Sequence, residues 1–371
     1  MNRMQDKFLG LLRFAIGASS DVPDIQPADW GRIYKQAEKQ SLLGIVFDGV
    51  ERMGDAVRMD EDLLMVWLGK CRKIEWRNRL LYEAVVRVSD YFGKKGFDAC
   101  ILKGQGNALM YPKPLRRTPG DVDIWVPGGA ADVIRFVHSV APGAKASYHH
   151  IDFPAYKGVA VEVHYRPCYL QNMVHNARLQ RFFRLHAQEQ FSHRTETEYG
   201  GFALPTASFN VVYQLVHIYN HLFQEGIGLR QIVDYYYVVK REDVNLDVDS
   251  LQRELQHLGL WKFAGALMFV LHEALGLPED KLLVPIDERR GRLLLNEIMQ
   301  GGNFGKYDKR YSFARGALGH NMQRLFRDLR LVSYYPAEAL SEPIFRLWHF
   351  LWRLAQSARL RWSRRARCWA P

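Results

Sequence analysis

The chain has 371 residues, of which 48% are hydrophobic and 25% are charged, and its formal net charge is +11 at pH 7. This composition excludes a largely disordered chain and leaves room for two or three domains with well-formed cores. The four cysteines stand far apart without a Cys-x-x-Cys pair, which excludes a disulfide framework or a zinc knuckle and indicates a reducing, cytoplasmic location.

The first 92 residues are predicted to form an N-terminal helical region. Apolar residues recur at helical spacing in four segments, 8–16, 30–40, 43–53 and 60–92. The first segment could be mistaken for the apolar part of a signal peptide, but Arg13 interrupts it and no small-residue cleavage site follows. Because the chain holds no run of about 18 uninterrupted apolar residues, no transmembrane helix is expected.

From about residue 97 the apolar period changes to two. Strands are therefore predicted at 97–102, 121–126, 145–153 and 158–165, with a helix at 130–139. The last two strands flank a short turn and look like a hairpin. We expect a small mixed β-sheet within a core that spans residues 93–205.

Two acids, Asp121 and Asp123, stand one residue apart at the start of the second predicted strand. On a strand, side chains two residues apart point to the same face, so these carboxylates would project together. Asp-x-Asp alone is a weak signal, since any exposed strand start can carry it. Two adjacent carboxylates repel each other unless a cation lies between them, and their oxygens suit Mg²⁺, with Mn²⁺ as the alternative. The pair therefore predicts metal-assisted phosphoryl or nucleotidyl chemistry.

A third acid, Glu162, lies in the last predicted strand and shares a face with His164. Burying an ionised carboxylate alone is costly, so Glu162 needs a partner. If its strand lies beside that of Asp123, three carboxylates converge and can hold two divalent ions. His164 is predicted to be a hydrogen-bonded structural histidine, with a ligand role as the alternative.

Two cationic residues precede the acids. Lys103 follows the first predicted strand, which would deliver it with Gly104 to the same edge of the sheet, and a solvated lysine is the alternative. Arg117 lies in a proline-bounded loop, 112–119, that is expected to border the cleft. Arg117 would contact a substrate phosphate or pair with one of the two aspartates.

Helices return in a predicted C-terminal domain, 206–343. Their apolar spacing places them at 207–223, 249–258, 261–275, 289–299 and 319–332, and a glycine turn at 226–228 opens another. The glycine-dense segment 301–305 is predicted to be a simple turn, because it lacks the Lys-Ser/Thr ending of a phosphate-binding loop.

Polar residues on these helices form two pairs with one-turn spacing. His217 and His221 could bind zinc, but the glutamate of the His-Glu-x-x-His motif is absent, so substrate contact or hydrogen bonding to Asp234 is favoured. Arg230 and Asp234 form the second pair, for which an intrahelical ion pair is the simplest interpretation.

The last segment, 344–371, contains seven arginines and no acid, so most of the net charge belongs to it. Its aromatic and aliphatic residues recur at helical spacing. Three explanations compete: a helix docked on the body with a solvated basic end, a membrane-surface helix, and a nucleic-acid contact.

Taken together, these motifs resemble the uncharacterised bacterial nucleotidyltransferase family of the DNA polymerase β-like superfamily. The quoted residues are Leu-Lys-Gly at 102–104, Tyr111, Arg117, Gly-Asp-Val-Asp at 120–123, Val-Glu-Val-His at 161–164, His217, His221, and the segments 228–234 and 301–305. The resemblance implies that Gly104 is the turn glycine, that Asp121 and Asp123 bind metal, and that Glu162 supplies the third acid. It also implies that Arg230 and Asp234 line the nucleotide cleft.

Two features depart from the superfamily pattern. Lys-Gly-Gln at 103–105 replaces the usual Gly-Ser or Gly-Gly turn, and the segment between Gly104 and Asp121 is longer than usual. Lys103 and Arg117 are the expected cationic substitutes at the phosphates.

We therefore predict an α+β enzyme with a small mixed-sheet nucleotidyltransferase core between helical regions. It would move a nucleoside monophosphate from an NTP such as ATP to an unidentified hydroxyl-type acceptor and release pyrophosphate, with two Mg²⁺ ions held by Asp121, Asp123 and Glu162. The candidate substrate-binding residues are Lys103, Gly104, Arg117, His164, His217, Arg230 and Asp234. The alternatives are a catalytically inactive nucleotide-binding or interaction protein on the same fold, and an RNA- or membrane-surface-associated module that uses the basic segment.

Overall fold

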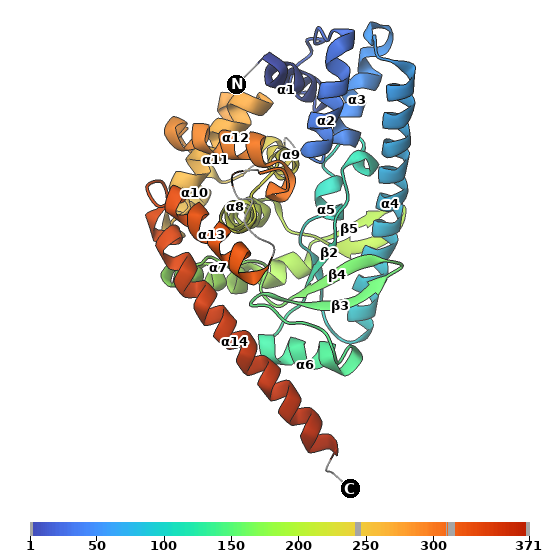
Figure 1. Ribbon diagram of the computed structural model, residues 1–371. Coiled ribbons are helices and arrows are strands. Elements are labelled where there is room, and N and C mark those ends of the chain that lie inside the picture. The colour runs from blue at the N-terminus through green and yellow to red at the C-terminus, as the bar shows by residue number, and fades with distance from the viewer. Residues whose placement is uncertain (1–2, 242–245, 309, 311–315, 369–371) are drawn as a thin grey trace.

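The computed structural model describes residues 3–241, 246–308, 310 and 316–368, and the side chains of these residues except 317, 318, 320 and 356–368. It has an α+β fold, with one mixed β-sheet flanked by helices (Figure 1). The predicted fold class is confirmed.

Helices occupy the chain ahead of the sheet, close to the predicted bounds. They are α1 Arg3–Ala15, α2 Trp30–Lys39, α3 Leu43–Met53 and α4 Glu61–Lys94. The carboxylate of Asp60 accepts a hydrogen bond from the backbone N–H of Leu63 and so caps the start of α4. The long helix α4 then runs alongside the sheet (Figure 1).

The sheet has six strands in the order β3-β4-β2-β1-β6-β5. Their bounds are β1 Cys100–Ile101, β2 Val122–Trp125, β3 His150–Tyr156, β4 Val159–His164, β5 Arg194–Thr197 and β6 Gly200–Ala203. The strand β2 runs parallel to β4, and β3 pairs with β4 as the predicted hairpin. The two strands expected to carry the acids are therefore neighbours.

Three strand predictions need correction. The strand predicted at 97–102 shrinks to β1, and β2 begins one residue after Asp121, which consequently lies outside the strand. The strand predicted from 145 begins at His150, and only an isolated bridge between Ala146 and Ile151 pairs the segment before it. The strands β5 and β6 and the helix α7, Met173–Ser192, had no counterpart in the prediction.

One face of the sheet is apolar and the other carries the acids. Apolar side chains of β2 and β4 pack with residues of α4 and of α6, Ala130–Val140, namely Val122, Ile124, Val161 and Val163. Because side chains alternate along a strand, Asp123 and Glu162 point to the opposite face. On that side, Trp125 packs against Phe191 and Phe209 of the following helices.

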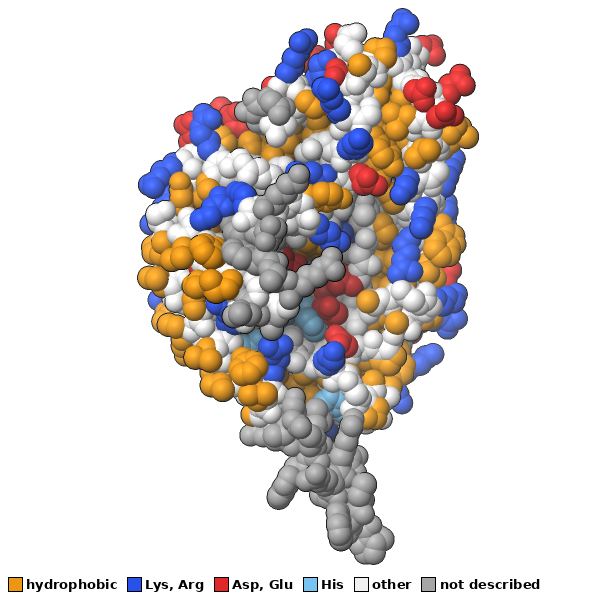
Figure 2. Space-filling model, viewed as in Figure 1, with side chains coloured by type: hydrophobic (Ala, Val, Ile, Leu, Met, Phe, Trp, Pro, Cys, Tyr) orange, Lys and Arg blue, Asp and Glu red, His pale blue; other side chains and the backbone are white. Residues whose placement is uncertain are grey.

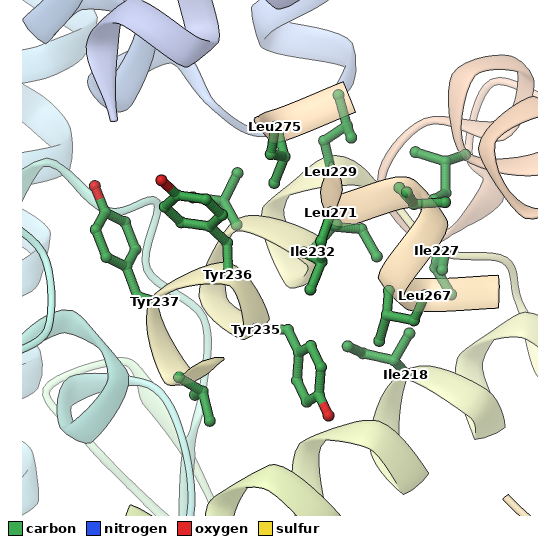
Figure 3. Packing of buried hydrophobic residues seen from close by; sticks show 14 of the residues in the cluster. Ile218, Ile227, Leu229, Ile232, Tyr235, Tyr236, Tyr237, Leu267, Leu271 and Leu275 are labelled. Atoms are coloured by element: carbon green, nitrogen blue, oxygen red, sulfur yellow. The ribbon is translucent and has the colours of Figure 1, made fainter. Parts of the chain in front are cut away.

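The helices after the sheet share a core with those before it. They are α8 Ala207–Gln224, α9 Leu229–Lys240, α10 Val248–His257, α11 Trp261–Leu275, α12 Glu288–Gly301, α13 Ala317–Leu331 and α14 Pro336–Cys368. Figure 3 shows Tyr235 of α9 near Ile218 of α8 and Leu267 of α11. The same apolar cluster extends from Phe8 to Ala339, so the predicted N-terminal and C-terminal helical regions pack as one body.

The helix α14 carries the predicted amphipathic segment. Phe345 and Trp348 lie against Tyr148, and Phe345 also stacks on Tyr169, so this part of the helix is docked on the body. A row of apolar side chains on α14 is nevertheless exposed, namely Leu340, Ile344, Leu347, Leu351 and Leu354. The arginines at 359, 361, 364, 365 and 367 lie outside the described side chains. Within the described chain, no helix has the length and apolar character needed to cross a bilayer.

Candidate active site

Two carboxylates meet on the polar face of the sheet. Asp123 of β2 and Glu162 of β4 are direct neighbours in the parallel register. Asp123 is only 2% exposed, whereas the Glu162 side chain is 28% exposed. Donor atoms of Asp123, Glu162 and His164 all lie within 4.8 Å of one another. The structure therefore brings two of the predicted acids together, one deep and one open to solvent.

His164, at the end of β4, bridges these acids. Its Nε2 lies 2.9 Å from Asp123 Oδ1 and 3.5 Å from Glu162 Oε2. Burial lowers the pKa of His164, but its hydrogen bonds to the two carboxylates outweigh burial and raise the pKa to about 9. Burial in turn raises the pKa of Glu162, yet the hydrogen bond from His164 holds that pKa below its usual value. The hydrogen bonding predicted for this histidine is present.

Lys103 is the cation that faces the acids. It follows β1, and its Nζ lies 3.2 Å from Asp123 Oδ2 and 3.4 Å from His217 Nε2. Burial lowers the pKa of Lys103, but Asp123 and the neighbouring carboxylates outweigh burial and raise the pKa above its usual value. Lys103 is therefore charged and ion-paired, and the alternative of a solvated lysine is wrong.

Gly104 and Asp121 lie beside this group. Gly104 has a φ of +65°, a left-handed conformation that favours glycine, and it opens the short helix α5, Gln105–Ala108. Asp121 lines the same cavity as Asp123. Among the described residues, however, no cluster of three donors within 4.8 Å includes Asp121. Of the three acids that were expected to converge, Asp123 and Glu162 therefore meet, whereas Asp121 lies farther out.

These residues line a cavity of about 310 Å³ between the sheet and the C-terminal helices. Its opposite wall comes from α8, α9 and the segment after α12, and includes His217, His221, Arg230, Asp234 and Phe304. Figure 2 shows acidic and histidine side chains gathered where this face of the molecule is hollowed. The volume falls at the lower end of the range for small-molecule sites, roughly 300–1,000 Å³.

Arg117 is held by a partner on another element. Its Nε and Nη2 donate to the two carboxylate oxygens of Asp234, each at 2.7 Å, and the Tyr111 hydroxyl donates to the same carboxylate at 2.6 Å. The predicted pairing of Arg117 with Asp121 or Asp123 is wrong. The buried pair instead ties the loop before the acids to α9.

Arg230 also departs from expectation. The predicted intrahelical ion pair with Asp234 is wrong, because that carboxylate accepts its hydrogen bonds from Arg117 and Tyr111, and Arg230 Nη1 donates to Thr118 O at 3.2 Å. Arg230 Nε is buried without a hydrogen-bond partner among the described residues. The Arg230 guanidinium therefore lines the cavity with one N–H that could donate a hydrogen bond to a ligand.

The glycine-dense segment 301–305 supplies one aromatic side chain to the cavity. It continues from α12 into a short 3₁₀ turn at Asn303–Gly305, as the sequence predicted for a turn. The Phe304 ring lies 5.0 Å from the His221 ring and 5.5 Å from the Arg230 guanidinium. A Cβ at Gly305 would lie 2.0 Å from Glu225 O, so this turn needs glycine there.

His217 and His221 are close to each other, with their Nε2 atoms 3.1 Å apart. Burial, with the charge of Lys103, lowers the pKa of His221 to about 3 and the pKa of His217 well below its usual value. Both imidazoles are therefore neutral at neutral pH. Within the described structure neither is hydrogen-bonded to Asp234, so that expectation is wrong, and a substrate contact stays a prediction.

A comparison with protein families identifies the family of this chain. Residues 26–276, well over half of the chain, match the model of a family described as uncharacterised nucleotidyltransferase. The chain belongs to this nucleotidyltransferase family. A search of curated proteins finds no match. Among solved structures the chain is similar to an antigenic nucleotidyltransferase-like protein from Paracoccidioides brasiliensis, with 14% identity over 57% of this chain and 96% of that one, at a TM-score of 0.29.

The sequence analysis missed two residues that the structure brings to the site, His149 and His150. His150 begins β3 and pairs with His164 in the antiparallel register, and His149 directly precedes the strand. His150 Nδ1 lies 3.3 Å from Glu162 Oε2 and 3.1 Å from His149 Nε2. Burial lowers the pKa of both imidazoles. The adjacent histidines within a predicted strand were the signal that could have found them.

Proposed function

We propose that this protein transfers a nucleoside monophosphate group from an NTP to a hydroxyl-type acceptor. A bond forms between the acceptor oxygen and the α-phosphorus as the bond from that phosphorus to the pyrophosphate oxygen breaks. The proposal is supported by the family and, above all, by Asp123 and Glu162 standing side by side at the base of a cavity that also holds cations. Positioning and charge neutralisation would supply the catalysis.

The donor set fits a hard divalent cation, Mg²⁺ or alternatively Mn²⁺. Asp123 and Glu162 offer carboxylate oxygens within 4.8 Å of each other, and Asp121 offers another carboxylate that lines the same cavity. These three residues would hold the cation, which would neutralise phosphate charge and make the acceptor hydroxyl more acidic.

The cations of the cavity would bind the triphosphate. Lys103 carries a positive charge beside the acids. Arg230 has a buried Nε without a hydrogen-bond partner in the described structure. Both side chains could therefore donate hydrogen bonds to phosphate oxygens. Gly104 allows close backbone approach. Two of the three guanidinium nitrogens of Arg117, Nε and Nη2, donate to Asp234, so we assign Arg117 a positioning role for the loop that precedes the acids.

The test is NTP turnover with Mg²⁺ by the full chain, measured as pyrophosphate release and as transfer of labelled nucleotide to fractionated extract. We expect Asp123→Asn to reduce turnover by at least about 100-fold, since it removes a charge that stabilises the transition state. Asp132→Asn, an exposed acid on α6, is the matched control and should be unchanged.

Two outcomes would overturn the proposal. Unchanged turnover in Asp123→Asn would remove the carboxylate from the mechanism. Nucleotide binding by the unmodified protein without any transfer, over the same extract fractions, would favour the catalytically inactive nucleotide-binding protein.

A further inference from the structure

Three histidines gather beside the acids, at the edge of the cavity where β3 and β4 pair. His149 directly precedes β3, His150 begins that strand, and His164 stands at the end of β4. Donor nitrogens of all three lie within 4.8 Å of one another. The proposed transfer reaction gives no role to His149 or His150, so this cluster needs its own explanation.

The donor atoms are spaced as metal ligands would be. His149 Nε2 lies 3.1 Å from His150 Nδ1, and one nitrogen of each of His149, His150 and His164 lies within 4.8 Å of the other two. Ligands placed tetrahedrally at about 2.0–2.1 Å from a zinc ion are about 3.4 Å apart. The separation between His149 Nε2 and His150 Nδ1 is close to that edge length.

The cluster is also held in place by its surroundings. The backbone N–H groups of Tyr165 and Arg166 both donate to His149 O, at 3.0 and 3.2 Å, which fixes the start of β3 against the end of β4. The Tyr169 ring packs 5.0 Å from the His149 ring. His164 is only 4% exposed, and its buried Nδ1 has no hydrogen-bond partner among the described residues. Backbone hydrogen bonds therefore join the two strand ends that carry the cluster, and the cluster contains an unsatisfied buried nitrogen.

We infer that His149, His150 and His164 bind a transition-metal cation of the Zn²⁺ or Co²⁺ class. Imidazole nitrogens select such ions over Mg²⁺, which prefers oxygen donors. Glu162 would border both this site and the oxygen site at Asp123. The inference goes beyond the proposed transfer activity, and its test does not use that activity.

The probe is Co²⁺, added to the full chain after removal of metals with a chelator. A tetrahedral nitrogen-rich site gives intense visible absorption bands, and we expect them to saturate at one equivalent of Co²⁺. Zn²⁺ should abolish the bands, whereas about a hundredfold excess of Mg²⁺ should leave them in place. Absence of the bands, or their loss with Mg²⁺, would overturn the inference without any variant.

Variants then assign the ligands. We expect His150→Asn to weaken Co²⁺ binding by at least about tenfold, a loss that even outer-shell partners of metals can cause. His186→Asn, an exposed histidine on α7, is the matched control and should bind as the unmodified protein does. Metal-free thermal unfolding checks that His150→Asn is folded, and unchanged binding in a folded His150→Asn would contradict the assignment.

A further variant separates this inference from the proposed function. Asp121→Asn should lose NTP turnover and retain the Co²⁺ bands, because Asp121 lines the cavity but shares no donor cluster with the histidines among the described residues. Loss of the bands in that variant would show that the histidines hold no site of their own.

Discussion

The protein buries acidic side chains in two places, and the pKa values of these side chains shift in opposite directions. In the cavity, burial raises the pKa of Asp123, but the charges of Lys103 and a neighbouring histidine outweigh burial and hold that pKa below its usual value. Between α13 and α14, burial and the neighbouring Glu342 raise the pKa of Asp328. Burial likewise raises the pKa of Glu338 to about 7.

The difference lies in the placement of cations. Lys103 Nζ reaches Asp123 at 3.2 Å, whereas Arg324 and Arg346 pair with Glu342 instead of Asp328. Depth of burial is similar in both regions, so it does not decide whether a carboxylate keeps its charge. Only a carboxylate that stays ionised attracts a metal ion, and this makes the cavity, and not the α13–α14 contact, the candidate catalytic region.

The largest effect is expected where a buried charge loses its counter-ion. Asp234→Asn would leave the Arg117 guanidinium buried without a carboxylate, and the free energy of unfolding should fall by about 4 kcal/mol. Urea unfolding at pH 6 measures this loss. The matched control is Asp328→Asn, where an acid of raised pKa is exchanged for a neutral amide, and we expect less than about 1 kcal/mol there. Equal losses in the two variants would erase the contrast between the regions.

An intermediate effect is expected from pH. The pKa of Glu338 rises from 4.5 to about 7 on folding, so its contribution to stability is fully present below pH 4.5 and is lost as the pH rises through 7. The total change is about 3 kcal/mol, at 1.36 kcal/mol for each pKa unit. Glu338→Gln cannot ionise and should lack this slope. Unfolding curves of the two proteins across pH 4.5 to 7.5 measure it, and parallel pH profiles would contradict the raised pKa.

The smallest effect is expected from the cation of the cavity. Lys103→Met removes the partner of Asp123 and should reduce the free energy of unfolding by about 2 kcal/mol, since Lys103 is partly exposed. Added Mg²⁺ should recover more thermal stability in this variant than in the unmodified protein, because the ion replaces the missing charge. Thermal unfolding with and without Mg²⁺ makes the comparison. Equal shifts in both proteins would show that the carboxylates do not bind the ion.

Local alternation made much of the site predictable. Asp123 and Glu162 each stand in a short run where apolar and polar residues alternate, so one face of each strand was assignable from sequence. Their meeting required only that the two strands be neighbours. The partner of Arg117 was not predictable, because Asp234 lies far along the chain and no local period indicates which buried charges meet. The two residues were singled out, but their pairing was not.

Two omissions have identifiable causes. The helix α7 exposes Met173, Val174 and Leu185 and buries Asn176 and Gln190, so its apolar stripe is irregular and its period is weak. His149 and His150 lay inside the strand predicted at 145–153, but a register irregularity between Phe153 and Tyr156 sets which residues of that segment face Glu162 and His164. Non-local pairing therefore hid more of the site than residue chemistry did.

The parallel alignment of β2 with β4 makes the site far more sensitive to a change in chain length than to most substitutions. Deleting a single residue from the first half of β4 would move every following side chain of the strand to the opposite face of the sheet. Val163 would then occupy the place of Glu162 in the cavity, and a carboxylate would enter the apolar layer beneath α4. Homologous chains that retain this chemistry should therefore vary in length at the Lys157–Gly158 turn and not within the strand.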